Sequence, residues 1–284
     1  MEVLTTKSAL RARLDAARAD GHTVGLVPTM GALHDGHLSL IAVAAAECDV
    51  VALTIFVNPL QFGAGEDLDA YPRPLERDLE LAAGAGASMA FTPSTDEMYP
   101  TPTATTVHVD GLSASMEGAS RPTHFDGVTT VVTKLFNAAG PCRAYFGEKD
   151  FQQLAVVRRM VADLDQPVTV VGCPIVREPD GLARSSRNVY LTPAERQVAP
   201  ALHRALELGA RMVEGGERDP AAIVERIAGV VHDSPPFELD YAEVVDSATL
   251  ERPEQLVPGA EVRLLVAARL GTPRLIDNLG VLVP

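Results

Sequence analysis

Several features that mark other classes of protein are scarce in this sequence. No apolar run is long enough to cross a bilayer, and the N-terminus lacks the basic, apolar and small-residue pattern of a secretory signal. Only three cysteines occur, Cys48, Cys142 and Cys173, widely spaced in apolar surroundings. We therefore expect a cytoplasmic protein with no membrane partner, whose thiols are reduced and buried and form neither disulfides nor a zinc site.

Positive charge is scarce too. The formal net charge is −14 at pH 7, which argues against DNA or tRNA as a partner, since phosphate backbones bind basic surfaces. A single nucleotide is compatible with this charge, because a few local donors can hold one triphosphate. Of the 24 basic residues only Lys7, Lys134 and Lys149 are lysines, so Lys149 carries more weight than one lysine among many would.

The first part of the chain alternates between helical and strand-like segments, which is typical of a parallel α/β sheet. Pro28 should close the first strand, and the segments Gly63–Pro74 and Thr92–Thr106, rich in Gly, Pro, Asp and Thr, should be loops that cover a site. We expect helices at residues 3–20, Leu38–Glu47, Arg77–Ala83, Val128–Ala138 and Gln152–Asp163, and strands at His22–Val27, Val50–Val57, Ser88–Phe91, Ala144–Phe146 and Val168–Cys173.

The pattern changes after about residue 176. Two long amphipathic helices are followed by three strand-like runs, which predicts a small α+β domain. A length of 284 residues is compatible with two domains. The helices are expected at Pro193–Gly215 and Ala221–His232, and the strands at Leu239–Val245, Val262–Leu270 and Leu275–Val283.

The turn after the first long strand holds His34, Asp35, Gly36 and His37. Backbone N–H groups and the dipole at a helix N-terminus attract anions, and two imidazoles there can donate to phosphate oxygens. Gly31 and Gly36 allow close approach of the backbone. A metal pair or incidental polar residues at a turn are the alternatives. Zinc is disfavoured because no further ligand follows at a suitable spacing.

Three other polar groups could take part in chemistry, and each has an ordinary structural explanation. Gly147–Asp150 follows a strand and could offer Lys149 to phosphates; the alternative is an ordinary capped helix start. Arg184–Asn188 could clamp phosphates, or is an Arg-rich turn with Ser caps. Asn58–Phe62 suits a small polar substrate, or is a turn begun by Asn. Two of them and the histidine turn follow parallel strands, whose carboxyl ends share one sheet edge.

Two common nucleotide motifs are absent. The sequence contains neither Gly-x-Gly-x-x-Gly nor a Walker lysine motif, which disfavours dinucleotide and P-loop chemistry.

Taken in order, several blocks resemble the pantothenate synthetase family. The blocks fall in the same order as in that family over nearly the whole first two-thirds of the chain, and a C-terminal run, VAARLGTPRLIDN, resembles that family as well. The blocks are Pro28–Leu38 (PTMGALHDGHL), Val57–Phe62 (VNPLQF), Asp69–Arg73 (DAYPR), Arg121–Gly127 (RPTHFDG), Phe146–Leu154 (FGEKDFQQL) and Ser185–Leu191 (SSRNVYL).

The resemblance implies a Rossmann-like, nucleotide- and pantoate-binding domain at residues 1–175, a small α+β lid domain at 176–284, and a homodimer. It implies that (R)-pantoate, ATP and β-alanine are converted to pantothenate, AMP and pyrophosphate, in pantothenate and coenzyme A biosynthesis, through a pantoyl-adenylate. The competing interpretations are an adenylyltransferase that stops at nucleotidyl transfer and a non-catalytic ATP-binding regulator on the same fold.

The resemblance also assigns roles to residues. His37, His34, Lys149 and Arg187 would be catalytic, together with Mg²⁺, whose ligands the motifs leave open; Asp78 is one guess. Gln61, Gln153 and Asn58 would bind pantoate, and Gln61 would also meet β-alanine. ATP would be bound by Met30, Gly31, Ala32, Leu33, His34, Asp35, Gly36, His37, Gly147, Glu148, Lys149, Asp150, Val176, Arg184, Ser185, Ser186 and Arg187.

Three positions depart from the family pattern. Arg184 stands where methionine is usual before Ser-Ser-Arg, which puts any packing of that side chain against the nucleotide in doubt. Phe151 replaces a tyrosine and removes a hydroxyl. Asp35 replaces a glutamate, and we expect its side chain to point outward.

Overall fold

The computed structural model describes residues 1–63, 65 and 68–284, and the chain divides into two compact units. The first unit consists of Met1–Glu148 and Gln152–Pro174, and the second of Lys149–Phe151 and Ile175–Pro284. The short segment Lys149–Phe151 therefore belongs with the C-terminal part of the chain, which its sequence position did not indicate.

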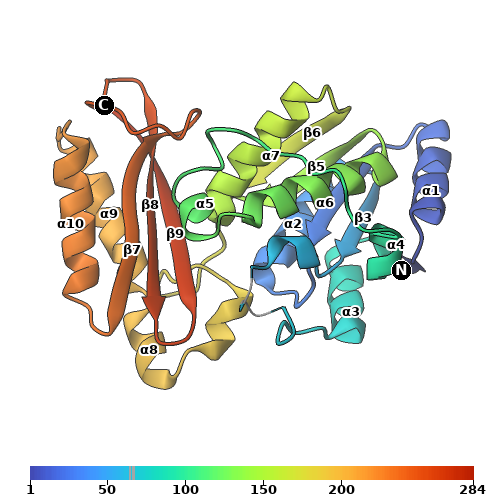
Figure 1. Cartoon of the computed structure of the whole chain (residues 1–284), viewed down its shortest axis with the longest axis horizontal. Coiled ribbons are helices and arrows are strands. Elements are labelled where there is room, and N and C mark those ends of the chain that lie inside the picture. The colour runs from blue at the N-terminus through green and yellow to red at the C-terminus, as the bar shows by residue number, and fades with distance from the viewer. Residues whose placement is uncertain (64, 66–67) are drawn as a thin grey trace. The chain divides into compact units, whose positions relative to one another are not determined.

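The first unit is built on a six-stranded parallel sheet with the order β1-β4-β3-β2-β5-β6 (Figure 1). This confirms the Rossmann-like parallel α/β fold that was expected. The strands are β1 (Glu2–Leu4), β2 (Val24–Thr29), β3 (Val50–Ile55), β4 (Met89–Phe91), β5 (Cys142–Gly147) and β6 (Val168–Cys173).

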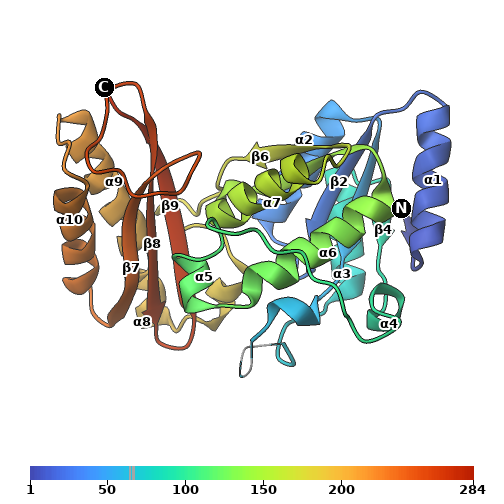
Figure 2. The same cartoon turned by 45° about the horizontal axis from the view of Figure 1, so that its top comes forward.

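Both faces of this sheet are covered, because successive strand residues point to opposite sides. Leu26 packs with helices α1, α6 and α7, whereas the next residue, Val27, packs with α2 and α3. Figure 2 shows α6 and α7 lying side by side on their face of the sheet. The helices are α1 (Lys7–Ala19), α2 (Asp35–Glu47), α3 (Leu75–Ala85), α4 (Thr95–Met98), α5 (Glu117–Ser120), α6 (His124–Ala139) and α7 (Phe151–Asp163), with short 3₁₀ turns η1 (Pro59–Gln61) and η2 (Glu148–Asp150).

Some expectations for this unit were wrong. The expected helix at residues 3–20 begins only at Lys7, because residues 2–4 form strand β1 beside β4. Pro28 does not end its strand but pairs with Thr54 of β3. The Thr29 carbonyl accepts a hydrogen bond from the Phe56 N–H, so Thr29 turns its main-chain groups toward β3. The preceding residue, Pro28, turns its nitrogen toward β5, and pairing with β5 stops at Leu26. Proline therefore removes no ladder bond there.

The structure differs from the expected loops and agrees with the expected thiols only in part. Segment 92–106 contains the short helix α4, and part of segment 63–74, namely residues 64, 66 and 67, lies outside the described residues. All three cysteines are free thiols; Cys48 and Cys173 are buried and Cys142 is half-buried. No helix in the described part of the chain is long and apolar enough to span a membrane.

The second unit is a three-stranded antiparallel sheet, β7-β8-β9, with α9 and α10 packed against it (Figure 1). The expected helix at 193–215 is two helices, because Pro200 cannot supply the N–H that would continue the first one. The elements are η3 (Ser186–Tyr190), α8 (Pro193–Val198), α9 (Ala201–Glu214), α10 (Pro220–His232), β7 (Phe237–Asp246), β8 (Glu261–Leu270) and β9 (Arg274–Leu282).

Candidate functional site

A tight turn connects β2 to α2 at the carboxyl edge of the parallel sheet. Gly31 and Ala32 both have positive φ, 85° and 49°. The N–H groups of Ala32 and Leu33 each donate to one carboxylate oxygen of Asp78, over 2.8 Å, and that side chain is only 1% exposed. Asp78, from α3, therefore fixes the backbone of the turn, and we assign it this role in place of the guessed magnesium ligand.

Two imidazoles cap the N-terminus of α2. The Gly36 N–H donates to Nδ1 of His34 over 3.1 Å, and the His34 N–H donates to Nδ1 of His37 over 3.4 Å. The ring centroids lie 4.1 Å apart. Because each Nδ1 accepts an amide hydrogen, the proton of each neutral ring is on Nε2, which makes Nε2 a donor. Asp35, between them, is exposed as expected.

The amide group that follows β3 is buried and tightly oriented. Asn58 is 1% exposed, and its Nδ2 donates to Gln61 Oε1 over 3.1 Å and to the Gly127 carbonyl over 3.0 Å. The Tyr99 hydroxyl donates to Asn58 Oδ1 over 2.7 Å. Gln61 Nε2 lies 3.1 Å from Met30 Sδ, so the structure brings this group beside the turn after β2.

The orientation of Gln61 follows from these bonds. Its Oε1 is an acceptor for Asn58, so Nε2 is the end that faces Met30. Its main-chain carbonyl is held by Arg121, over 3.2 Å, and by Nδ1 of His124, over 3.0 Å. The RPTHFDG block thus positions Gln61 through its main chain. The sequence pattern of that block predicts neither this role nor the part that Tyr99 plays.

Two adjacent glutamines near the start of α7 differ in their surroundings. Gln152 is buried, and its amide bonds the main chain at Leu112, Ser115 and Glu117. Gln153 is half-buried. Gln152 is therefore a structural residue, whereas Gln153 keeps the accessibility that a ligand-binding side chain needs.

Lys149 and Asp150 follow β5 but belong to the second unit. Lys149 is 20% exposed at its side chain, and Nζ lies 3.9 Å from Asp150 Oδ1. Its main-chain carbonyl accepts a hydrogen bond from Asn278 Nδ2 over 2.8 Å.

The Arg184–Arg187 segment leaves a short hairpin in the same unit. An antiparallel bridge joins Arg177 to Ala183, and the Arg184 N–H donates to the Val176 carbonyl over 2.9 Å. Ser185 caps the turn by accepting from the Arg187 N–H over 3.3 Å. The Arg184 guanidinium forms an ion pair with Glu178 at 3.1 Å, which gives this unusual arginine a partner within the hairpin.

A family profile described as pantoate-beta-alanine ligase matches residues 2–280. A pantothenate synthetase of Moorella thermoacetica is 51% identical over 279 residues, 98% of each chain, and one of Mycolicibacterium vanbaalenii is 52% identical over 99% of this chain and 88% of the relative.

Solved structures agree. Pantothenate synthetase from Thermus thermophilus superposes with a TM-score of 0.92 at 50% identity, covering 98% of this chain and 99% of the other. A ligase from Francisella tularensis, complexed with β-γ ATP and β-alanine, has a TM-score of 0.80 at 31% identity over 98% and 97%. Because profile, relatives and structures all match nearly end to end, the chain belongs to the pantoate–β-alanine ligase family.

Proposed function

We propose that this chain condenses (R)-pantoate with β-alanine to give pantothenate, with ATP converted to AMP and pyrophosphate. The observation that carries the proposal is the pair of capping imidazoles on the turn whose Met30 contacts Gln61, in a chain that matches a ligase family over residues 2–280. A relative solved with β-γ ATP and β-alanine supports the choice of nucleotide and amine.

In the first step a carboxylate oxygen of pantoate attacks the α-phosphorus of ATP, and the bond to the bridging oxygen breaks to release pyrophosphate. The carboxylate is already ionised at pH 7, so this step needs charge neutralisation and no general base. We assign it to Nε2–H of His34 and His37, together with Lys149 and Arg187. Helix α2 adds the positive end of its dipole.

In the second step the amine of β-alanine, having lost a proton, attacks the acyl carbon of pantoyl-adenylate, and AMP leaves with the electrons of the broken C–O bond. The mixed anhydride must be shielded from water until then. We propose that residues 176–284 act as a lid and that loop 184–188 closes over it.

Binding roles follow the chemistry of the side chains. Gln61 and Gln153 bind pantoate through their amides, and Gln61 also meets β-alanine. Asn58 was expected to bind pantoate, but its amide is buried and bonded at both ends, so we propose that it orients Gln61 instead. The proposed ATP contacts are Met30, Gly31, Ala32, Leu33, His34, Asp35, Gly36, His37, Gly147, Glu148, Lys149, Asp150, Val176, Arg184, Ser185, Ser186 and Arg187.

Mg²⁺ is proposed to enter with ATP, because this ion is usually held by substrate phosphates and water with few protein carboxylates. Among the described residues, no three His, Cys, Asp or Glu side chains are grouped so that they could hold a metal. The cytoplasmic location and the homodimer remain proposals as well; sedimentation that gives a mass of one chain would overturn the dimer.

The reaction is tested with ATP and pantoate, with and without β-alanine. Release of AMP and formation of pantothenate that require both acid and amine are the expected result. Transfer of the nucleotidyl group to the acid with no AMP release and no pantothenate after the amine is added would indicate an adenylyltransferase, and ATP binding without turnover would indicate a regulator.

A further inference from the structure

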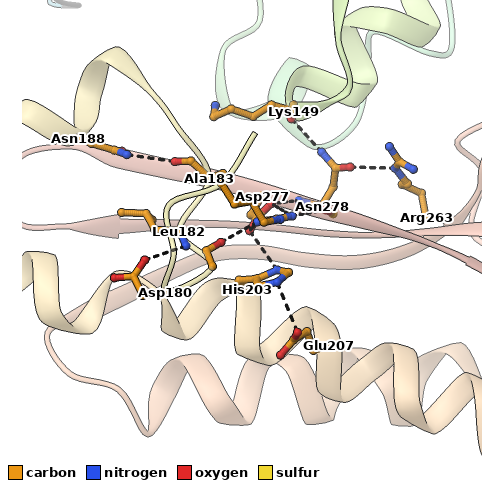
Figure 3. A network of polar contacts seen from close by, with 12 residues as sticks. Lys149, Asp180, Leu182, Ala183, Asn188, His203, Glu207, Arg263, Asp277 and Asn278 are labelled. Carbon is orange, nitrogen blue, oxygen red and sulfur yellow. Dashed lines mark hydrogen bonds and ion pairs between the residues drawn. The ribbon is translucent and has the colours of Figure 1, made fainter. Parts of the chain in front are cut away.

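Two consecutive residues of β9, Asp277 and Asn278, lie in the C-terminal block that the proposed reaction leaves without a role. They are 4% and 2% exposed. Their side chains leave opposite faces of the strand, and both are fully engaged in polar contacts (Figure 3).

Asn278 holds the main chain at Lys149. Its Nδ2 donates to the Lys149 carbonyl over 2.8 Å, and its Oδ1 accepts from Nε of Arg263 over 2.8 Å. The Arg263 guanidinium lies over the ring of Phe151, 3.8 Å from its centroid. Residues 149–151 are therefore fixed at both ends by one small group on β8 and β9.

Space for this group depends on Gly280. A Cβ there would lie 2.6 Å from Nη1 of Arg263. The glycine leaves room for the guanidinium over Phe151, so the arrangement is built into the sheet.

Asp277 holds the other phosphate-binding segment. Both of its carboxylate oxygens accept from Arg177, over 2.7 and 2.9 Å, and the Asn278 N–H donates to Oδ1 over 2.7 Å. Arg177 also donates to the carbonyls of Gly181 and Asn278, over 3.0 and 3.2 Å. Arg177 is the base of the hairpin that continues into Arg184–Arg187.

We propose that Asp277 and Asn278 are positioning residues for adenylation, which set Lys149 and the Arg184–Arg187 segment at a fixed spacing. One strand holds both segments, so neither can shift without breaking a partly buried hydrogen bond. A displacement of about 1 Å in a catalytic group can cost roughly a hundredfold in rate. This inference rests on the proposed function, since it assigns a purpose to Lys149 and Arg187.

The main test is Asn278→Asp. The aspartate carboxylate can still accept from Arg263, but it cannot donate to the Lys149 carbonyl. It places a second acceptor oxygen against that carbonyl instead. Pantoate-dependent exchange of pyrophosphate into ATP measures adenylation alone, and titration of active sites corrects for misfolded protein. We expect kcat per site to fall about tenfold or more, with the KM for pantoate within about twofold of wild type, because the pantoate amides are untouched.

Asp277→Asn is the second variant, and there we expect a raised KM for ATP, because Arg177 loses its bidentate partner and the Arg184–Arg187 segment shifts. Asp240→Asn is the matched control: it breaks the Asp240–Arg274 ion pair of the same sheet, to which neither segment contributes a partner, and should leave both constants unchanged.

The outcomes separate this inference from the proposed function. If the wild type turns over and Asn278→Asp has the same kcat per active site as Asp240→Asn, this inference is overturned and the proposed function is not. Equal loss in all three variants, or loss of active sites at an unchanged rate per site, also overturns it, since it would mean a purely structural role. A wild-type chain that shows no pantoate-dependent exchange overturns the proposed function and this inference with it.

Discussion

At the level of single residues, His34 and His37 use their two nitrogens for different purposes. Nδ1 satisfies a main-chain N–H at the start of α2, which would otherwise lack a partner within the helix. This leaves the proton on Nε2, so capping selects the tautomer that can donate to a phosphate. The helix start and the proposed chemistry therefore depend on the same two rings.

His37→Ala should reduce kcat by at least about 10²-fold, because a donor to the transition state is lost. It should also lower the melting temperature, since the His34 N–H loses its acceptor. His37→Gln is the matched variant: glutamine at this position can still accept from the capping N–H. We expect it to restore most of the stability and little of the rate. Normal turnover in His37→Ala would refute the assignment.

Tyr99 should set the orientation of the substrate amides. Its hydroxyl is protonated at neutral pH, as in any tyrosine, and burial raises its pKa further, to about 12; the hydroxyl donates to Asn58. Tyr99→Phe lets the Asn58 amide turn over, and Gln61 with it. We expect the KM for pantoate to rise about three- to tenfold, from the loss of roughly 1 kcal/mol, with the KM for ATP unchanged.

The control for this variant is Tyr145→Phe. Tyr145 is also buried, and its hydroxyl donates to Glu47 over 2.9 Å in another part of the same unit. It should lose stability without any change in the KM for pantoate. An equal rise in both variants would mean that the Tyr99 effect is not one of orientation.

At the level of elements, the hairpin 177–183 packs closely on α9. A Cβ at Gly181, whose φ is +94°, would lie 2.5 Å from Cδ2 of His203, so only glycine fits the turn. His203 Nδ1 lies 3.8 Å from Asp277 Oδ2 and Nε2 lies 3.5 Å from Glu207. Burial, and then the Arg177 charge, lower the pKa of His203, although Asp277 and Glu207 act in the opposite direction.

This shift predicts a pH dependence of stability. The folded state binds a proton at His203 less readily than the unfolded chain does, whose histidine has the ordinary pKa of 6.5. The unfolded state therefore gains protons first as the pH falls, and the free energy of unfolding decreases below about pH 6.5. Urea titrations at pH 7.5 and 5.5 should show a smaller decrease for His203→Gln than for wild type. His22→Gln, at an exposed site, should behave as wild type does; equal decreases in all three would contradict the prediction.

At the level of the whole molecule, the net charge predicts which partners the chain attracts. With −14 formal charges, the long-range field opposes association with duplex DNA or tRNA, while the proposed ATP contacts are local. We expect no retardation of either nucleic acid in gels at physiological salt up to about 10 μM protein, because non-specific affinities of basic proteins are about 10⁻⁴–10⁻⁶ M. Retention at lower concentration would show that a basic surface outweighs the net charge.

The amino-acid pattern alone determined the order of the elements and the position of the polar groups along it. Alternation of apolar strands and amphipathic helices is a local signal, and so are the motifs around His34, Gln61, Lys149 and Arg187. Strand β1 was missed because three residues carry too little periodicity. Pro28 misled for a different reason: whether a proline breaks a strand depends on which neighbour its nitrogen faces.

Only the tertiary structure decided which residues hold the polar groups in place. The bonds that hold these groups join residues far apart in the sequence. Asp78 bonds Leu33 across 45 positions, Tyr99 bonds Asn58 across 41, and Asn278 bonds Lys149 across 129. No local pattern connects such pairs, because the contact exists only after strands and helices have packed. The sequence by itself therefore determined which reactive side chains are present, and the packing of the chain determined how those side chains are oriented.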